Sequence, residues 1–394
     1  MTRFLKRAVR RADTAIGRWL GPRRVIVDAR TPMNFAVLAP VADALQRDPR
    51  VETAFTTEHP DEIAAAAAVA DLRFPIHPRH AMTWRRADLC ISADPWDPVE
   101  LRRCLRRVNF FHGMAGKYDL DAPGRLPAGF GDFDRVAFVN ADRMRRYVQA
   151  GIVKPEAAVL VGYPKVDALV NGLYDPGAIR AHLQLDERRR TAIYAPTWSS
   201  ASSLNLAGEA IVKRLLDAGL NVIVKLHDRS LDAANAKFSG GIDWRERFAR
   251  MQQPGRLAFV EVADSSPLLA ASDVMVTDHS SIGFEFILLS RPLVIFDAPD
   301  LERVARINPD KIALLRSAAR VVQTADAIGA AALDELEHPE RRAAARHAIV
   351  REMFHEPGTA TARALKMVYE LLELPLPHSQ IVGVHDAHIA ESAL

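Results

Sequence analysis

Short apolar runs that alternate with helical patterns constrain the fold of this chain more than any other feature of its sequence. In the first half the runs lie at residues 25–27, 51–56, 89–92, 108–111, 135–140 and 159–161. Helix-forming stretches such as 35–45 and 143–149 follow several of them. Because a helical crossover between strands imposes parallel pairing, we expect a doubly wound parallel sheet.

A second set of runs begins after residue 190. These runs lie at 192–195, 221–226, 257–262, 274–277 and 293–296. The stretch 171–190 is rich in Gly, Pro and charge, as a connection between domains often is. We therefore expect an α/β protein with two doubly wound, Rossmann-like domains in tandem and a cleft between them. The expected boundaries are a surface helix at 1–24, domains at 25–171 and 172–350, and a helix with a tail at 351–394.

Residues 1–24 hold eight basic residues and one acidic residue, a net charge of +7, whereas the whole chain carries +3. Leu5, Val9, Ile16 and Trp19 share one helical face. This pattern is typical of a helix that lies on an anionic membrane surface. The alternative is a helix packed on its own domain with a solvated basic face. Nucleic acid is not an expected partner, because no further basic stripe follows.

The expected location of the protein depends on the lack of a membrane span and on the small number of cysteines. No apolar stretch reaches the ~18 residues of a membrane span. The two cysteines, Cys90 and Cys104, fit a reducing compartment. We therefore expect a cytoplasmic protein that is peripheral on the inner face of the cell membrane.

The first chemically active loop follows the run at 108–111. It begins with His112, a residue type whose pKa near ~6.5 suits general base catalysis. Gly113 permits a tight turn, and Lys117 adds a positive charge. The alternative is a structural histidine at a sheet edge.

Two further strand ends carry groups suited to a phosphate. Thr197 follows the run at 192–195 and offers a hydroxyl. Lys225 and His227 are two residues apart, so on a strand they would share a face and could neutralise a diphosphate. The alternatives are an ordinary strand exit, a solvated lysine and a structural histidine.

The fourth strand end runs directly into the helical pattern at 280–289. Ser280 and Ser281 offer hydroxyls next to free backbone N–H groups, which together suit an anion. The alternative is plain helix capping. Asp278 either binds a hydroxyl, orients a histidine or caps the helix. No carboxylate cluster with metal-ligand spacing is apparent, so we expect neither a metal nor a cofactor.

Taken in order, these residues resemble the CDP-glycerol glycerophosphotransferase family, which includes the teichoic-acid primases and polymerases. The matching segments are His112-Gly113 with Lys117, GYPKVD at 162–167, YAPTW at 194–198, Lys225 with His227, TDHSSIGFE at 277–285 and GTATAR at 358–363. Three positions depart from the family pattern: Met114-Ala115 replaces Thr-Pro, Asp228 replaces Pro and His279 replaces Tyr. These departures leave the polyol and the acceptor open.

The resemblance implies the GT-B fold, with two Rossmann-like domains facing a central cleft, and it also implies a reaction and a set of roles. CDP-glycerol or a related CDP-polyol would be the donor, and a lipid-linked or glycan hydroxyl would be the acceptor, in the synthesis of teichoic acid, capsule or another cell-surface polymer. His112 would act as the base, while His227 and Arg363 would stabilise the departing CMP. Thr197, Lys225, Asp278, Ser280 and Ser281 would complete the donor site, with Gly113 and Lys117 in the acceptor loop. Two alternatives stay open: an enzyme that acts on nucleotide sugars, either a GT-B glycosyltransferase or a UDP-sugar 2-epimerase, and a non-catalytic membrane scaffold.

Overall fold

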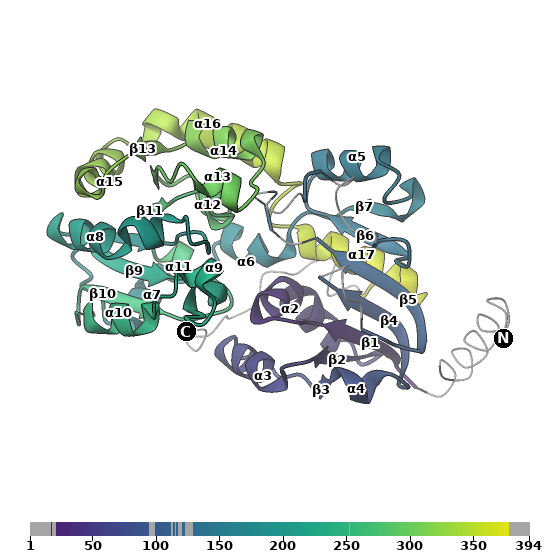
Figure 1. Cartoon of the computed structure of the whole chain (residues 1–394). Coiled ribbons are helices and arrows are strands. Elements are labelled where there is room, and N and C mark those ends of the chain that lie inside the picture. Colours follow the sequence, from purple (N-terminus) through teal and green to yellow (C-terminus); the bar gives the residue numbers. More distant parts are fainter. Residues whose placement is uncertain are drawn as a thin grey trace. The chain divides into compact units, whose positions relative to one another are not determined.

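The chain folds into two compact units in a computed structural model. The structure describes residues 17, 21–93, 99–111, 113–114, 116, 120–122, 129–251 and 253–377. Unit 1 combines Met1–His112, Pro123–Asp167 and Phe354–Ala393, and unit 2 combines Gly113–Ala122 with Ala168–Met353. The C-terminal helix α17 (Ala360–Leu372) therefore belongs to unit 1 (Figure 1).

Unit 1 is built on a seven-stranded sheet in the order β3-β2-β1-β4-β5-β6-β7. All of its neighbouring strands are parallel, as the alternation of strands and helices predicts. The strands are β1 (Arg23–Asp28), β2 (Val51–Thr57), β3 (Ile76–Pro78), β4 (Arg86–Ser92), β5 (Arg103–Phe110), β6 (Arg135–Phe138) and β7 (Ala158–Leu160). The order reverses between β1 and β4, which is the switch point of a doubly wound sheet.

Helices connect the strands of unit 1. They are α2 (Pro32–Gln46), α3 (Pro60–Val69), α4 (Arg79–Met82) and α5 (Ala141–Gln149), with the short turns η3 (Pro155–Ala157) and η4 (Pro164–Val166). The hydroxyl of Thr31 accepts a hydrogen bond from the Asn34 amide (3.2 Å) and so caps α2. Helix α6 (Asp167–Val170) then leads into unit 2.

Unit 2 repeats the same plan with six parallel strands in the order β10-β9-β8-β11-β12-β13. They are β8 (Thr191–Tyr194), β9 (Asn221–Lys225), β10 (Leu257–Val260), β11 (Val274–Thr277), β12 (Leu293–Phe296) and β13 (Arg320–Val322). Its helices are α7 (Pro176–His182), α8 (Ser203–Asp217), α9 (Ala236–Ser239), α10 (Trp244–Met251), α11 (Ser266–Ala270), α12 (Ile282–Ile287), α13 (Leu301–Val304), α14 (Pro309–Ser317), α15 (Ile328–Glu337) and α16 (Ala343–Met353). Short turns η5 (Asp228–Leu231), η6 (Ala325–Ala327) and η7 (Pro339–Arg342) complete the unit. Here the order reverses between β8 and β11.

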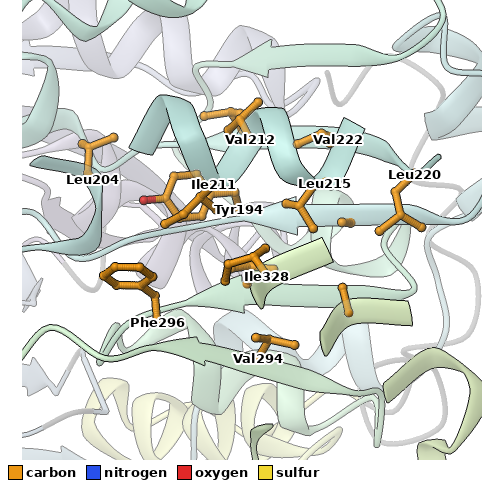
Figure 2. Packing of buried hydrophobic residues seen from close by; sticks show 14 of the residues in the cluster. Tyr194, Leu204, Ile211, Val212, Leu215, Leu220, Val222, Val294, Phe296 and Ile328 are labelled. Carbon is orange, nitrogen blue, oxygen red and sulfur yellow. The ribbon is translucent and has the colours of Figure 1, made fainter. Parts of the chain in front are cut away.

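The core of unit 2 fixes the strand ends on which the candidate site is built. Ile211 of α8 and Ile328 of α15 pack with Val294 of β12 in one buried cluster (Figure 2). Full burial of each such side chain contributes about 1.5–3 kcal/mol. Tyr194, the last residue of β8, belongs to the same cluster, and its hydroxyl lies 3.0 Å from the hydroxyl of Ser203 at the start of α8. The apolar core and the loop after β8 are therefore linked through one side chain.

Candidate active site

The switch point of unit 2 brings the loops after β8 and β11 together. Tyr194 pairs with Val276 in the sheet, and the Ala195 amide donates to the Val276 carbonyl (3.0 Å). The Thr277 hydroxyl then donates to the Ala195 carbonyl (2.6 Å). The segments after β8 and β11 thus leave the sheet side by side at its carboxyl edge, where ligands bind in doubly wound sheets.

Asp278 ties these two loops to each other. Its side chain is fully buried, and one carboxylate oxygen accepts from the Thr197 amide (2.9 Å). The other oxygen accepts from the Ser203 amide and hydroxyl, both at 3.0 Å. A carboxylate at the start of α8 is also favoured by the helix dipole. Asp278, which the sequence places among the donor-binding residues, is therefore engaged by protein groups of the loop after β8.

That loop presents an aromatic platform. Trp198 follows Thr197, and its ring lies 5.6 Å from the His227 ring and 5.0 Å from the Phe238 ring, centroid to centroid. The guanidinium of Arg229 lies 4.4 Å from the centroid of Trp198 and 5.2 Å from that of Phe238. Two aromatic rings thus hold an exposed guanidinium, an arrangement that favours the cation.

Arg229 is a candidate site residue that the sequence analysis missed. Among the described residues, no carboxylate forms an ion pair with it, so its charge is available to a ligand. One feature could have pointed to Arg229: β8 and β9 are neighbouring strands, so the loops that follow them lie close together. The 3-10 turn that returns Arg229 over Trp198 has no such signal in the sequence.

His227 lies just beyond β9, in the turn that leads to η5. Its Nδ1 accepts a hydrogen bond from the Arg229 amide (3.2 Å), so in the neutral ring the proton sits on Nε2. The expectation that Lys225 and His227 share a strand face is wrong, because β9 ends at Lys225. The Lys225 side chain is buried, and its Nζ donates to the Leu226 carbonyl (2.6 Å).

Ser280 and Ser281 lie half-buried between β11 and α12. The helix begins at Ile282 and has six residues, so it is shorter than the pattern at 280–289 predicts. The Ser281 side chain does not cap it, which removes the simple capping alternative for that residue. The two serines follow Asp278 by two and three residues in the segment that leaves β11, which is one of the two strands at the switch point.

Arg363, which the resemblance places at the donor, lies in unit 1, and the structure engages its whole guanidinium there. Its Nε donates to the Val161 carbonyl (2.8 Å), and Nη1 donates to the Glu356 carboxylate (2.8 Å) and the Thr359 hydroxyl (2.7 Å). Nη2 donates to the carbonyls of His355 and Glu356, both at 2.8 Å. A guanidinium has five N–H donors, so all are used within unit 1.

The segment 162–167 explains why the motif around Arg363 exists. The Asp167 carboxylate accepts from the amides of Gly358 (3.0 Å), Ala360 (3.1 Å) and Thr361 (2.6 Å), which caps α17. Gly162 has φ +91°, and a Cβ there would lie 2.6 Å from the His355 carbonyl oxygen. Two motifs far apart in the sequence are therefore one structural junction.

Some predicted residues cannot be placed. His112, Lys117 and the segment 1–20, apart from Gly17, lie outside the described residues. Gly113 is described and has φ +78°, with nothing within 4 Å of an added Cβ. The turn after His112 therefore uses the left-handed backbone that glycine adopts without strain. Within the described ranges, no three His, Cys, Asp or Glu side chains gather as a metal site requires.

A family model described as CDP-Glycerol:Poly(glycerophosphate) glycerophosphotransferase matches residues 135–370. The match spans more than half of the chain and includes Thr197, His227, Asp278 and both serines. The chain belongs to this family. The motifs at 162–167 and 358–363 lie within the same match, so the family likeness covers both the structural junction and the switch-point loops.

Relatives and solved structures agree with this membership. The teichoic acid poly(glycerol phosphate) polymerase of Staphylococcus epidermidis is 29% identical over 155 residues, 38% of this chain and 20% of that protein. The teichoic acid glycerol-phosphate primase of Bacillus spizizenii is 23% identical over 183 residues, 45% of this chain and 43% of that protein. The chain thus spans less than half the length of these relatives.

The expected two-sheet α/β fold is confirmed. A variant of the wall teichoic acid polymerase TagF superposes with a TM-score of 0.68 at 17% identity, covering 89% of each chain. A UDP-GlcNAc 2-epimerase from Neisseria meningitidis superposes with a TM-score of 0.55 at 13% identity, covering 89% of this chain and 99% of that one. At such identities the likenesses concern the fold alone.

Proposed function

We propose that this protein transfers a glycerol phosphate unit from CDP-glycerol, or a related CDP-polyol, to an acceptor hydroxyl and releases CMP. The observation that carries the proposal is the set of loops at the unit 2 switch point. Trp198, His227, Arg229 and the two serines at 280 and 281 follow three strands of one sheet. The family match over 135–370 includes all of them.

The donor diphosphate binds at these loops. His227 offers Nε2–H, and Arg229 offers a guanidinium that is already oriented by two rings. Hydroxyls of Ser280 and Ser281 and the loop at Thr197 complete the site. Such donors stabilise the negative charge that grows on the departing CMP phosphate. Asp278 and Lys225 act indirectly, since both side chains are buried at the strand ends from which the donor-carrying loops leave.

The chemical step is a displacement at phosphorus. The acceptor oxygen forms a bond to the phosphorus that bears glycerol, and the bond from that phosphorus to the bridging oxygen breaks. The electron pair leaves with CMP, and the proton of the acceptor hydroxyl goes to His112. Gly113 shapes the loop of this base and Lys117 adds a positive charge. Positioning and electrostatic stabilisation supply most of the rate, and the step as written needs no redox cofactor.

The acceptor in this proposal is a lipid-linked or glycan hydroxyl, as in the synthesis of a teichoic-acid type of polymer. Residues 1–24, with their net charge of +7, hold the protein on the anionic inner face of the cell membrane. Along the part of the chain that the structure describes, no helix is both long and apolar enough to cross a bilayer. One TagF structure was determined after a soak with CDPG, which supports the same class of donor for this fold.

A nucleotide-sugar enzyme is the second candidate, because the fold is shared with UDP-GlcNAc 2-epimerase. The test is a panel of CDP-glycerol, other CDP-polyols and UDP-sugars, with the released nucleotide identified by chromatography. We expect CMP from a CDP-polyol and neither UMP nor UDP from any UDP-sugar. Turnover of a UDP-sugar alone would support the second candidate and contradict the first.

A further inference from the structure

The segment that follows the proposed base belongs to the unit that carries the donor loops. Residues 113–122 are part of unit 2, whereas His112, which is bonded directly to them, is part of unit 1. Phe111 is buried, and its amide donates to the Ala137 carbonyl (3.0 Å). Met114 is fully buried. The chain is therefore fixed shortly before and shortly after His112. We call residues 113–122 the base loop.

Asp121 connects the base loop to Asn308. The Nδ2 of Asn308 donates to a carboxylate oxygen of Asp121 (3.3 Å), and the Asp121 side chain is buried. The backbone of Gly116 lies against the same carboxylate, because a Cβ added at Gly116 would lie 2.1 Å from that oxygen. Two parts of the base loop, five residues apart, thus meet at the group that Asn308 contacts.

Asn308 is itself fixed as the N-cap of α14. Its Oδ1 accepts a hydrogen bond from the Asp310 amide (3.0 Å), which directs Nδ2 toward Asp121. Ile307 and Ile312 stand one residue before and four residues after the cap, and both belong to one buried cluster. Such an apolar contact fixes the angle at which a chain enters a helix. The amide group of Asn308 is therefore oriented by α14.

Helix α14 packs on the helix that follows the two donor-site serines. A Cβ added at Gly283 of α12 would lie 3.1 Å from a methyl carbon of Leu315 in α14. The same Cβ would lie 3.7 Å from the methyl carbon of Thr277, the last residue of β11. The base loop and the end of β11 are thus connected through α14 and α12 within unit 2.

We propose that Asn308 is a positioning residue for the transfer step: through Asp121 it fixes the base loop, which is bonded directly to His112. This rests on the proposed function, in which His112 takes the proton of the acceptor hydroxyl. A misplacement of about 1 Å, caused far from the reacting atoms, can cost about 10²-fold in rate. Loss of the tie therefore lowers the rate of the chemical step while the donor still binds.

The test uses Asn308→Asp, which keeps a capping oxygen for α14 but places a second carboxylate against Asp121. We expect kcat for CMP release to fall about ten- to hundredfold, while the KM for CDP-glycerol changes less than about twofold. The reciprocal variant Asn308→Asp/Asp121→Asn restores an amide facing a carboxylate and should recover most of the lost kcat. The control Asp175→Ala removes the capping carboxylate of α7 in unit 2 and should leave kcat unchanged.

Hydrogen–deuterium exchange on the same proteins tests the tie without the reaction. In Asn308→Asp the peptide that contains the base loop should exchange faster, while peptides from the unit 2 sheet exchange as in the unmodified protein. Unchanged kcat, unchanged exchange in the base loop, or a loss of kcat that the reciprocal variant does not reverse would overturn the inference. Should the unmodified protein release no CMP from any CDP-polyol, the proposed function fails, and the exchange rates still decide whether Asn308 holds the base loop.

Discussion

At the residue scale, His112 is the group on which the proposed chemistry depends most. Replacing His112 with Ala should lower CMP release by about 10²–10⁴-fold, the usual contribution of a general base. The KM for CDP-glycerol should change little, because the proposed donor site lies in the unit 2 loops. His182→Ala, at an exposed position on α7, is the control. Steady-state kinetics with near wild-type turnover in His112→Ala would remove this residue from the mechanism.

Arg229 tests the donor site itself. Arg229→Met should raise the KM or Kd for CDP-glycerol about tenfold or more, since a charge-assisted hydrogen bond is lost. Arg229→Lys should recover part of that affinity, because it restores the charge without the fork of donors. Arg303→Ala, another exposed arginine of unit 2, should leave donor binding unchanged. Calorimetry that finds equal donor affinity in Arg229→Met and in the unmodified protein would contradict this assignment.

At the element scale, α17 is fixed to unit 1 by Arg363 and Asp167. Arg363→Ala should lower the free energy of unfolding by about 2 kcal/mol, because the backbone carbonyl groups of Val161, His355 and Glu356 lose their donor. Below the unfolding transition, donor affinity should stay unchanged, since the guanidinium is engaged in unit 1. Chemical denaturation and calorimetry measure the two quantities. Lost donor affinity with unchanged stability would restore the role that the sequence motif implies.

A second tie of α17 predicts a pH dependence. The Tyr369 hydroxyl donates to the Asp48 carboxylate (2.7 Å), and the hydrogen-bonded Arg50 guanidinium lowers the pKa of Asp48 from 3.8 to about 2. A depressed pKa stabilises the fold above pH 4 by about 2 kcal/mol, and this contribution disappears as the pH falls toward 2. The stability difference between the unmodified protein and Asp48→Asn should therefore shrink over that window. A difference that stays constant from pH 4 to 2 would contradict this tie.

The sequence predicted the helices and strands better than it predicted the roles of individual residues. The alternation of apolar runs and helices predicted parallel sheets, because local periodicity decides between strand and helix. It could not predict that α17 returns to unit 1, since that depends on contacts between residues far apart, such as Asp167 with Thr361. It also could not show which protein groups engage Asp278 and Arg363, because a side chain that the protein engages and one that binds phosphate belong to the same residue types.

At the scale of the whole molecule, we predict that membrane attachment and chemistry can be separated. Removing residues 1–22 should weaken binding to anionic vesicles strongly, because most of the basic residues of the segment 1–24 are lost. CMP release with a soluble acceptor should survive, because the proposed donor and base residues lie elsewhere in the chain. Sedimentation and activity assays on the same preparation measure both. A truncated protein that binds vesicles as well as the full chain would exclude residues 1–22 as an attachment element.

The central claim is that this protein transfers glycerol phosphate from CDP-glycerol. The most direct measurement follows CMP release and the mass of a glycan or polyol acceptor in one reaction with the full-length protein. We predict that each CMP released is matched by one glycerol phosphate unit gained by the acceptor, and that His112→Ala lowers both by about 10²–10⁴-fold. Release of free glycerol phosphate without any gain by the acceptor, or turnover confined to UDP-sugars, would contradict the claim.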